Sequence, residues 1–191
     1  MITTTLTLAD YLSRDTGPEA RCEFVDGEII EMPPESEDNV VIGSYLVAQL
    51  LRVVPFAWVR QGRTEIVVSG RVRVPDVMVL GASLTDALKG RPRSTITEDM
   101  PPPLLVVEVV SPGKANEDRD YRYKRSEYAA RGIAEYWIVD PLRQQVTVLT
   151  WVDGFYEAQE LRGEAVLRSP QLPDLTLTVA QLLHPQEPDR G

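Results

Sequence analysis

The segment PLLVVEVVSPGKANEDRDYRYKRSEYAARGIAEYWIVDP, residues 103–141, contains the pattern that decides the fold. It begins with an apolar run at 104–110, which is rich in β-branched residues and has a length that suits a buried strand. A predicted helix follows over residues 116–130. A second apolar strand is predicted at 136–139. The succession therefore predicts a strand, a crossover helix and a second strand.

Two charged residues stand out in this segment. Glu108 lies inside the first strand, where a carboxylate is expensive to bury unless it binds a cation or a hydrogen-bond partner. On the helix, Tyr121, Lys124 and Tyr128 are spaced i, i+3 and i+7, so they share one face. That face can look toward the sheet, which would bring Lys124 inward. Alternatively, Lys124 lies along the surface with its stem covering a tyrosine.

The rest of the chain is expected to form short helices, hairpins and loops. A helix is expected over residues 37–53, with a buried face at Val41, Leu46, Leu50 and Val54. We expect one domain over residues 1–184 and a disordered tail at 185–191. The other predicted elements are a helix at 7–14, a hairpin at 23–32 around Asp26-Gly27, strands at 57–61, 65–68 and 71–80, a loop at 81–103 with a helical piece at 84–88, a hairpin of strands 144–151 and 155–161, and a helical turn at 179–183.

Asp76 follows a proline in the middle of the predicted strand 71–80, where both residue types are disfavoured. Such a residue indicates either a site or a bulge in an edge strand. Together with Glu108 it offers two carboxylates on neighbouring strands, which suit Mg²⁺, and the backbone carbonyl of Val109 could add a third ligand. Lys124 could position or activate a water, or neutralise charge on a phosphate oxygen. Two acids and a lysine are the smallest set of side chains that metal-dependent phosphodiester hydrolysis requires.

Composition narrows the classes of function. A net charge of −9 argues against a general nucleic-acid coat protein. Basic residues outnumber acidic ones in segments 60–93 and 114–131, which indicates either a local basic cleft or solvated arginines without a ligand. A single cysteine, Cys22, excludes an internal disulfide, and a single histidine, His184, disfavours histidine-based metal sites and Ser-His-Asp triads. We expect a cytoplasmic protein without membrane association, because no apolar run approaches a bilayer span and no signal peptide is recognisable.

The motifs also resemble a known family. Pro75-Asp76 followed by Glu108 in an apolar strand is similar to the signature of the PD-(D/E)XK nuclease superfamily. Within it, VDGEIIEM, VPDV, VVEVVSP, DRDYRYKRSEYAARGIAEYWIVDP and LPDLTLTVAQLL resemble the Uma-two family of putative restriction endonucleases over about residues 5–183. The resemblance implies an α/β (α+β) fold in which helices flank a mixed central β-sheet. An N-terminal and a C-terminal hairpin would extend this restriction-endonuclease-like core.

The resemblance also implies roles for particular residues. The metal-binding acids fall on Asp76 and Glu108. Val110 occupies the usual place of the superfamily lysine, two residues after the acid. In this family the lysine lies on the next helix, which favours Lys124 over Lys114 in the turn before it.

One further position departs from the family pattern, and another matches it. Family members often carry a histidine at the start of the first long helix, where this chain has Asp38. Gln61 matches a recurring strand glutamine at the edge of the site. The implied substrate is DNA and the implied cofactor is Mg²⁺ or Mn²⁺. Two cuts in duplex DNA would favour a homodimer.

Three functions remain open. The first is a metal-dependent DNA endonuclease. The second is a non-catalytic nucleic-acid- or partner-binding module that keeps the nuclease fold, which the acidic composition favours. The third is a hydrolase of small phosphates, ranked last because the chain lacks a glycine-rich phosphate loop.

Overall fold

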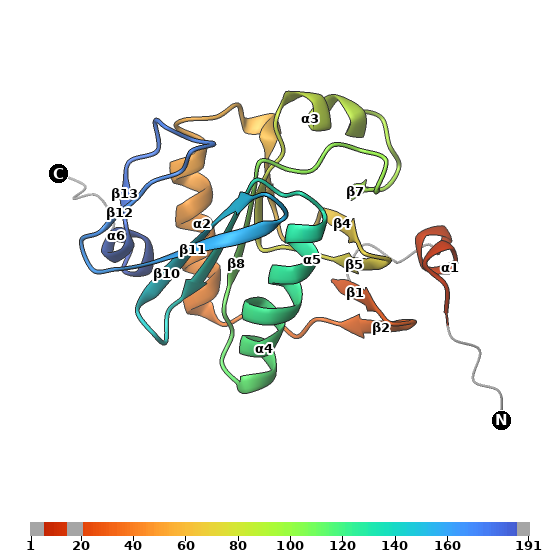
Figure 1. Ribbon diagram of the computed structural model, residues 1–191, viewed down its shortest axis with the longest axis horizontal. Coiled ribbons are helices and arrows are strands. Elements are labelled where there is room, and N and C mark those ends of the chain that lie inside the picture. The colour runs from red at the N-terminus through yellow and green to blue at the C-terminus, as the bar shows by residue number, and fades with distance from the viewer. Residues whose placement is uncertain (1–5, 15–20, 187–191) are drawn as a thin grey trace.

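Two mixed β-sheets form the framework of the protein, for which a computed structural model describes residues 6–14 and 21–186 (Figure 1). In the six-stranded central sheet, β8 and β9 are parallel and every other neighbouring pair is antiparallel. Its strands, in spatial order, are β11 (Phe155–Arg162), β10 (Gln145–Val152), β9 (Glu135–Asp140), β8 (Leu105–Val109), β6 (Val77–Val79) and β3 (Val59–Gln61).

The parallel pair confirms the predicted strand, helix and strand. A parallel pair needs a crossover connection of about a dozen or more residues. Here α4 (Lys114–Asp118), η2 (Arg119–Lys124) and α5 (Arg125–Ala130) run as one helical stretch. The stretch starts two residues earlier than expected, and its middle third, η2, is π-helical rather than α-helical. Single π-turns inside α-helices are often found at functional sites.

Alternation along β8 assigns each side chain to one face of the central sheet. Leu105, Val107 and Val109 belong to a core shared with α2 (Glu37–Leu50) and α6 (Val179–Leu183). Val106 and Val110 pack in a second core with Tyr128 of α5. Glu108 therefore points to the side of the sheet that α5 covers. Figure 1 shows the positions of α2 and α5 relative to β8.

The second sheet corrects the strand predicted at 71–80. Residues 71–73 form β5 of the second sheet, whereas residues 77–79 form β6 of the central sheet. Pro75 and Asp76 therefore lie in the crossover between two sheets, and neither a central strand nor an edge-strand bulge contains them. The second sheet is ordered β2 (Glu28–Glu31), β1 (Cys22–Val25), β5 (Arg71–Arg73), β4 (Glu65–Val68) and β7 (Thr95–Ile96).

The N-terminal hairpin is confirmed, and it forms the edge of this second sheet. Helix α1 (Leu8–Ser13) covers the sheet through Tyr11, which packs with Phe24, Val67 and Val72. The protein thus has two large sheets where a single central sheet was expected. The α+β class with mixed sheets and flanking helices is as predicted.

Smaller differences concern helix ends and phase. Helix α2 ends at Leu50 rather than near residue 53, and its buried face includes Ile42 while Val41 is exposed. The first residues of the strand predicted at 57–61 belong to the 3₁₀ turn η1 (Phe56–Trp58). The C-terminal hairpin β10–β11 and helix α3 (Ala82–Leu88) are confirmed. A two-stranded ribbon of β12 (Val166–Leu167) and β13 (Leu177–Thr178) precedes α6.

Residues 187–191 of the predicted tail lie outside the described residues. Within the described part of the chain, no helix combines the length and apolar character that crossing a bilayer requires.

Candidate active site

One small pocket brings together the three residues that the sequence singled out. Asp76 from the crossover between the sheets, Glu108 from β8 and Lys124 from η2 all line it. Its volume is about 30 Å³, which is room for about one water-sized group. The remaining lining residues are Arg21, Met32, Pro33, Pro34, Glu35, Val109, Ser111, Asn116 and Arg119.

Asp76 is held in place through both of its carboxylate oxygens. Oδ2 accepts a hydrogen bond of 2.7 Å from the backbone N–H of Val109, and Oδ1 accepts one of 2.6 Å from Arg21. The backbone carbonyl of Asp76 accepts from the N–H of Gly62 at 2.9 Å, next to β3. Asp76 is thus tied to the end of β8, one residue beyond Glu108.

Glu108 is almost fully buried and has two donors on one oxygen. Its Oε1 accepts from Lys124 Nζ at 2.8 Å and from the Tyr128 hydroxyl at 2.7 Å. Neither donor occupies Oε2. Burial raises the pKa of Glu108 to about 7, with the charge of Lys124 opposing the rise and that of Asp76 adding to it.

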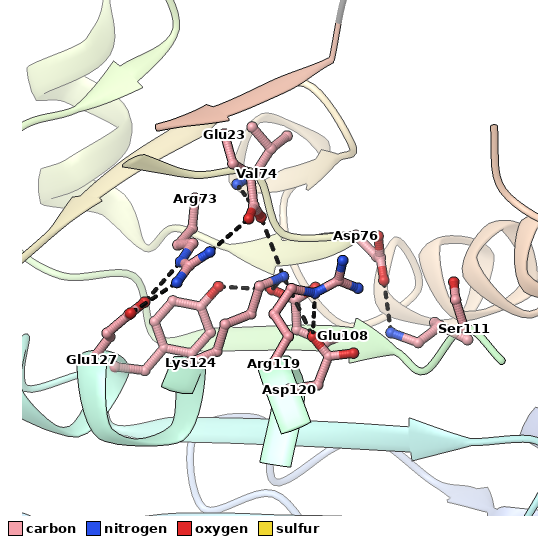
Figure 2. Close-up of polar contacts among 12 residues, drawn as sticks. Glu23, Arg73, Val74, Asp76, Glu108, Ser111, Arg119, Asp120, Lys124 and Glu127 are labelled. Atoms are coloured by element: carbon pink, nitrogen blue, oxygen red, sulfur yellow. Dashed lines mark hydrogen bonds and ion pairs between the residues drawn. The ribbon is translucent and has the colours of Figure 1, made fainter. Parts of the chain in front are cut away.

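Lys124 points inward, with only 1% of its side chain exposed, so the surface interpretation is wrong (Figure 2). Its ammonium lies 2.8 Å from Glu108, 3.3 Å from Glu23 and 3.6 Å from Asp120. Burial by itself lowers the pKa of Lys124, but these three carboxylates raise it above its ordinary value. Lys124 is therefore a permanent cation near neutral pH.

The shared inward face of the helix is confirmed. Tyr128 is a fully buried member of the core on that side of the sheet, and Tyr121 packs against the same core. Tyr121 also donates a hydrogen bond of 3.1 Å to Asp140 at the end of β9. Lys124 is thus delivered to Glu108 by a helix anchored at both flanking tyrosines.

The structure adds charged residues that the sequence reasoning missed. Glu23 of β1, 1% exposed, bonds both Lys124 and Arg73. Arg73 in turn bonds Glu127, and Arg119 bonds Asp120, as Figure 2 shows. Glu23 is one of three glutamates in the N-terminal hairpin, and nothing in the local pattern marks it as buried.

Arg21 and Glu35 form a second missed group, at the mouth of the pocket. Arg21 donates to Asp76, to the carbonyl of Val74 and to Glu35. Burial, and the neighbouring charge of Asp76, raise the pKa of Glu35 despite Arg21. The Arg21 guanidinium therefore lies between the carboxylates of Asp76 and Glu35, in the way that a metal cation would.

The other candidates from the sequence do not reach the pocket. Among the described residues that line it, neither Gln61, Asp38 nor Lys114 appears, and all three are exposed. Asn39, the neighbour of Asp38, is buried instead and donates to the Val109 carbonyl at 3.4 Å. That carbonyl, predicted as a metal ligand, thus has a long hydrogen bond already.

The donor types in the pocket fit Mg²⁺, although they fall short of a preformed cage. Mg²⁺ is usually held by one or two carboxylates and keeps several waters. Asp76, Glu108 and the Val109 carbonyl match that set. The described residues contain no cluster of three or more His, Cys, Asp or Glu side chains arranged to hold a metal. An ion that took Oδ1 of Asp76 would have to displace Arg21.

Comparisons with known proteins agree with the resemblance read from the sequence motifs. The Uma2 family model, described as "Putative restriction endonuclease", matches residues 8–180. A crystal structure of a putative nuclease belonging to DUF820 from Anabaena variabilis ATCC 29413 has a similar fold, with a TM-score of 0.70. The two chains are 19% identical, and the match covers 93% of this chain and 97% of that one. No curated protein matches this chain.

Proposed function

The chain belongs to the Uma2 family of putative restriction endonucleases, and from that premise we propose that it is a Mg²⁺-dependent DNA endonuclease. Its fold is shared with a solved structure described as a putative nuclease. The proposed site comprises Asp76, Glu108 and Lys124. One observation carries the proposal: two carboxylates from different segments share a pocket with a buried ammonium that bonds one of them.

Asp76, Glu108 and the Val109 carbonyl would hold the ion, which supplies a Lewis acid for the phosphate and lowers the pKa of bound water. Lys124 keeps its proton near neutral pH because of its three carboxylate neighbours. It is therefore assigned to orienting the water or neutralising charge on a phosphate oxygen rather than to removing a proton. Tyr128 and Lys124 both bind Oε1 of Glu108, so Oε2 is the oxygen that would bind the ion.

The test is a nuclease assay of the full chain with Mg²⁺, Mn²⁺ or a chelator, on duplex, single-stranded and branched DNA. Cleavage should require the ion, and Asp76→Asn should reduce it by at least about 100-fold, the scale of losing one preorganised charge-stabilising group. Glu108→Gln should behave the same way. Asp38→Asn is the matched control, because Asp38 is an exposed acid outside the pocket.

Calorimetric titration with Mn²⁺ supplies a readout apart from activity. Binding to the wild type and to Asp38→Asn, with loss in Asp76→Asn, is expected. Cleavage that persists in a chelator, or Asp76→Asn with full activity, would refute the proposal. Sedimentation of the protein with duplex DNA would show whether two copies assemble for cleavage of both strands.

A non-catalytic binding module is the second candidate, and one observation favours it. More than half of the cations in the basic segments are paired with carboxylates of this chain, which lowers the net positive charge that they offer a DNA backbone. The ion-paired members are Arg71, Arg73, Lys89, Arg93, Arg119, Arg122 and Lys124. DNA binding that is unchanged by metal, with no cleavage of any substrate, would select this alternative.

A further inference from the structure

We infer that a second pocket, beside the candidate active site, binds one unpaired nucleobase of the DNA strand that is cut. This inference rests on the proposed function and specifies its substrate as single-stranded or locally opened DNA. The pocket, called the base pocket below, lies between the β1–β2 hairpin and η2. Its lining residues are Glu23, Val25, Asp26, Ile30, Met32, Arg71, Arg73, Arg119, Tyr123 and Glu127.

The base pocket has the size that a base requires and the active site lacks. Its volume is about 330 Å³, within the range of small-molecule sites. The active-site pocket, at about 30 Å³, has room for little more than one phosphate oxygen or water. A nucleotide that places its phosphate there must therefore put its base elsewhere.

The two pockets are neighbours. Met32 and Arg119 line both of them. Tyr123 in the base pocket directly precedes Lys124 in η2, so one helical segment serves both. A strand whose phosphate contacts Lys124 can thus set a neighbouring base against Tyr123.

The charges in the base pocket cancel, which favours an uncharged occupant over a second phosphate. Arg73 bonds Glu23 and Glu127, both at 2.7 Å. Arg71 bonds Asp26 at 2.7 Å and Glu127 at 2.8 Å. Figure 2 shows the Arg73 pairs and Arg119 beside Lys124. Guanidinium groups already paired with carboxylates offer a phosphate little net positive charge, but their edges can still hydrogen-bond a base.

The remaining walls are aromatic and apolar. The Tyr123 side chain is 54% exposed, and Ile30 is 42% exposed on β2, all of whose residues are exposed. Met32 and Val25 complete the apolar lining. Exposed aromatic rings beside a backbone-binding groove are the usual means of holding unpaired bases by stacking. A base in a duplex cannot reach such a ring without leaving its stack.

The experiment measures binding of a fluorescent single-stranded oligonucleotide carrying 2-aminopurine, in chelator so that no cleavage occurs. Tyr123→Ala should weaken binding by about 5- to 100-fold, the value of one base–aromatic stack. Tyr123→Phe should keep the affinity, because the ring remains. Phe155→Ala is the control, since Phe155 is an exposed aromatic of β11 outside the pocket.

Two further arms separate a base site from general attraction to DNA. Against a strand with an abasic position in place of each base in turn, Tyr123→Ala should lose its effect at one position. Wild-type affinity for the fully paired duplex should be lower than for the single strand. Equal losses of affinity for the base-containing and abasic strands, or no loss at all in Tyr123→Ala, would overturn the inference.

The binding and cleavage measurements together distinguish failure of the base-pocket inference from failure of the proposed nuclease function. Metal-dependent cleavage by the wild type that is unaffected by Tyr123→Ala would refute the base pocket alone. Binding that depends on Tyr123, with no cleavage under any metal, would support the base pocket and refute the nuclease.

Discussion

Glu23→Gln should lower the free energy of unfolding by about 3 kcal/mol at pH 7. Burial raises the pKa of Glu23, but the charges of Lys124 and Arg73 outweigh burial and lower it from 4.5 to about 2. Since a tenfold change in an equilibrium constant is about 1.4 kcal/mol, this difference corresponds to about 3 kcal/mol of stability. The carboxylate has 1% of its side chain exposed, so solvent provides little screening.

The sign of the pH dependence follows from the lowered pKa. The folded protein releases the proton of Glu23 more readily than the unfolded chain does, so the contribution is complete above about pH 4.5. It is lost as the pH falls from about 4.5 toward 2. The cost of Glu23→Gln should therefore shrink to about 1 kcal/mol near pH 3.

Urea unfolding of wild type and variant at pH 7 and pH 3 measures the effect. Glu160→Gln serves as the control, because Glu160 is exposed on β11, and its cost should stay within about 0.5 kcal/mol. A Glu23→Gln cost that is negligible at pH 7, or equal at both pH values, would refute the reasoning that the cations of the cluster stabilise this buried carboxylate.

Three other predictions concern Lys124, Glu108 and Arg21. Lys124→Ala should cost about 3–5 kcal/mol in urea unfolding, since it leaves buried carboxylates without their cation, and should abolish cleavage while Mn²⁺ binding survives; the exposed Lys114→Ala should do neither. Because burial raises the pKa of Glu108 to about 7, its carboxyl signal in NMR should titrate near neutral pH without metal and well below it with Mg²⁺; a titration near pH 4.5 without metal would be inconsistent. Arg21→Gln should tighten Mn²⁺ binding in calorimetry, because Arg21 occupies Oδ1 of Asp76; weaker binding would contradict that competition.

Local pattern was enough for the elements that carry Glu108 and Lys124. An apolar, β-branched run followed by an amphipathic helix and a second apolar run specifies a parallel pair and its crossover, because strands and helices have different periods. The same alternation put Glu108 and Val110 on one side of β8. The i, i+3, i+7 spacing put Lys124 between two inward tyrosines, and the π-turn in η2 did not change that outcome.

Alternation could not show that residues 71–80 divide between two sheets, because each half reads as strand by itself. Nor could the sequence show that Ile42 is buried and Val41 exposed. Both residues are apolar and adjacent, so the pattern does not decide which of them faces the core.

Sequence by itself thus determined the unit of strand, crossover helix and strand, and the positions of Glu108 and Lys124 within it. Only the tertiary structure decided which charges meet. Glu23, Arg73 and Lys124 come from segments far apart in the chain, and their pairing depends on the N-terminal hairpin packing beside η2. Burial makes the loss of either partner costly, because a desolvated charge must find a partner, yet burial is a property of the assembled sheets rather than of any one segment.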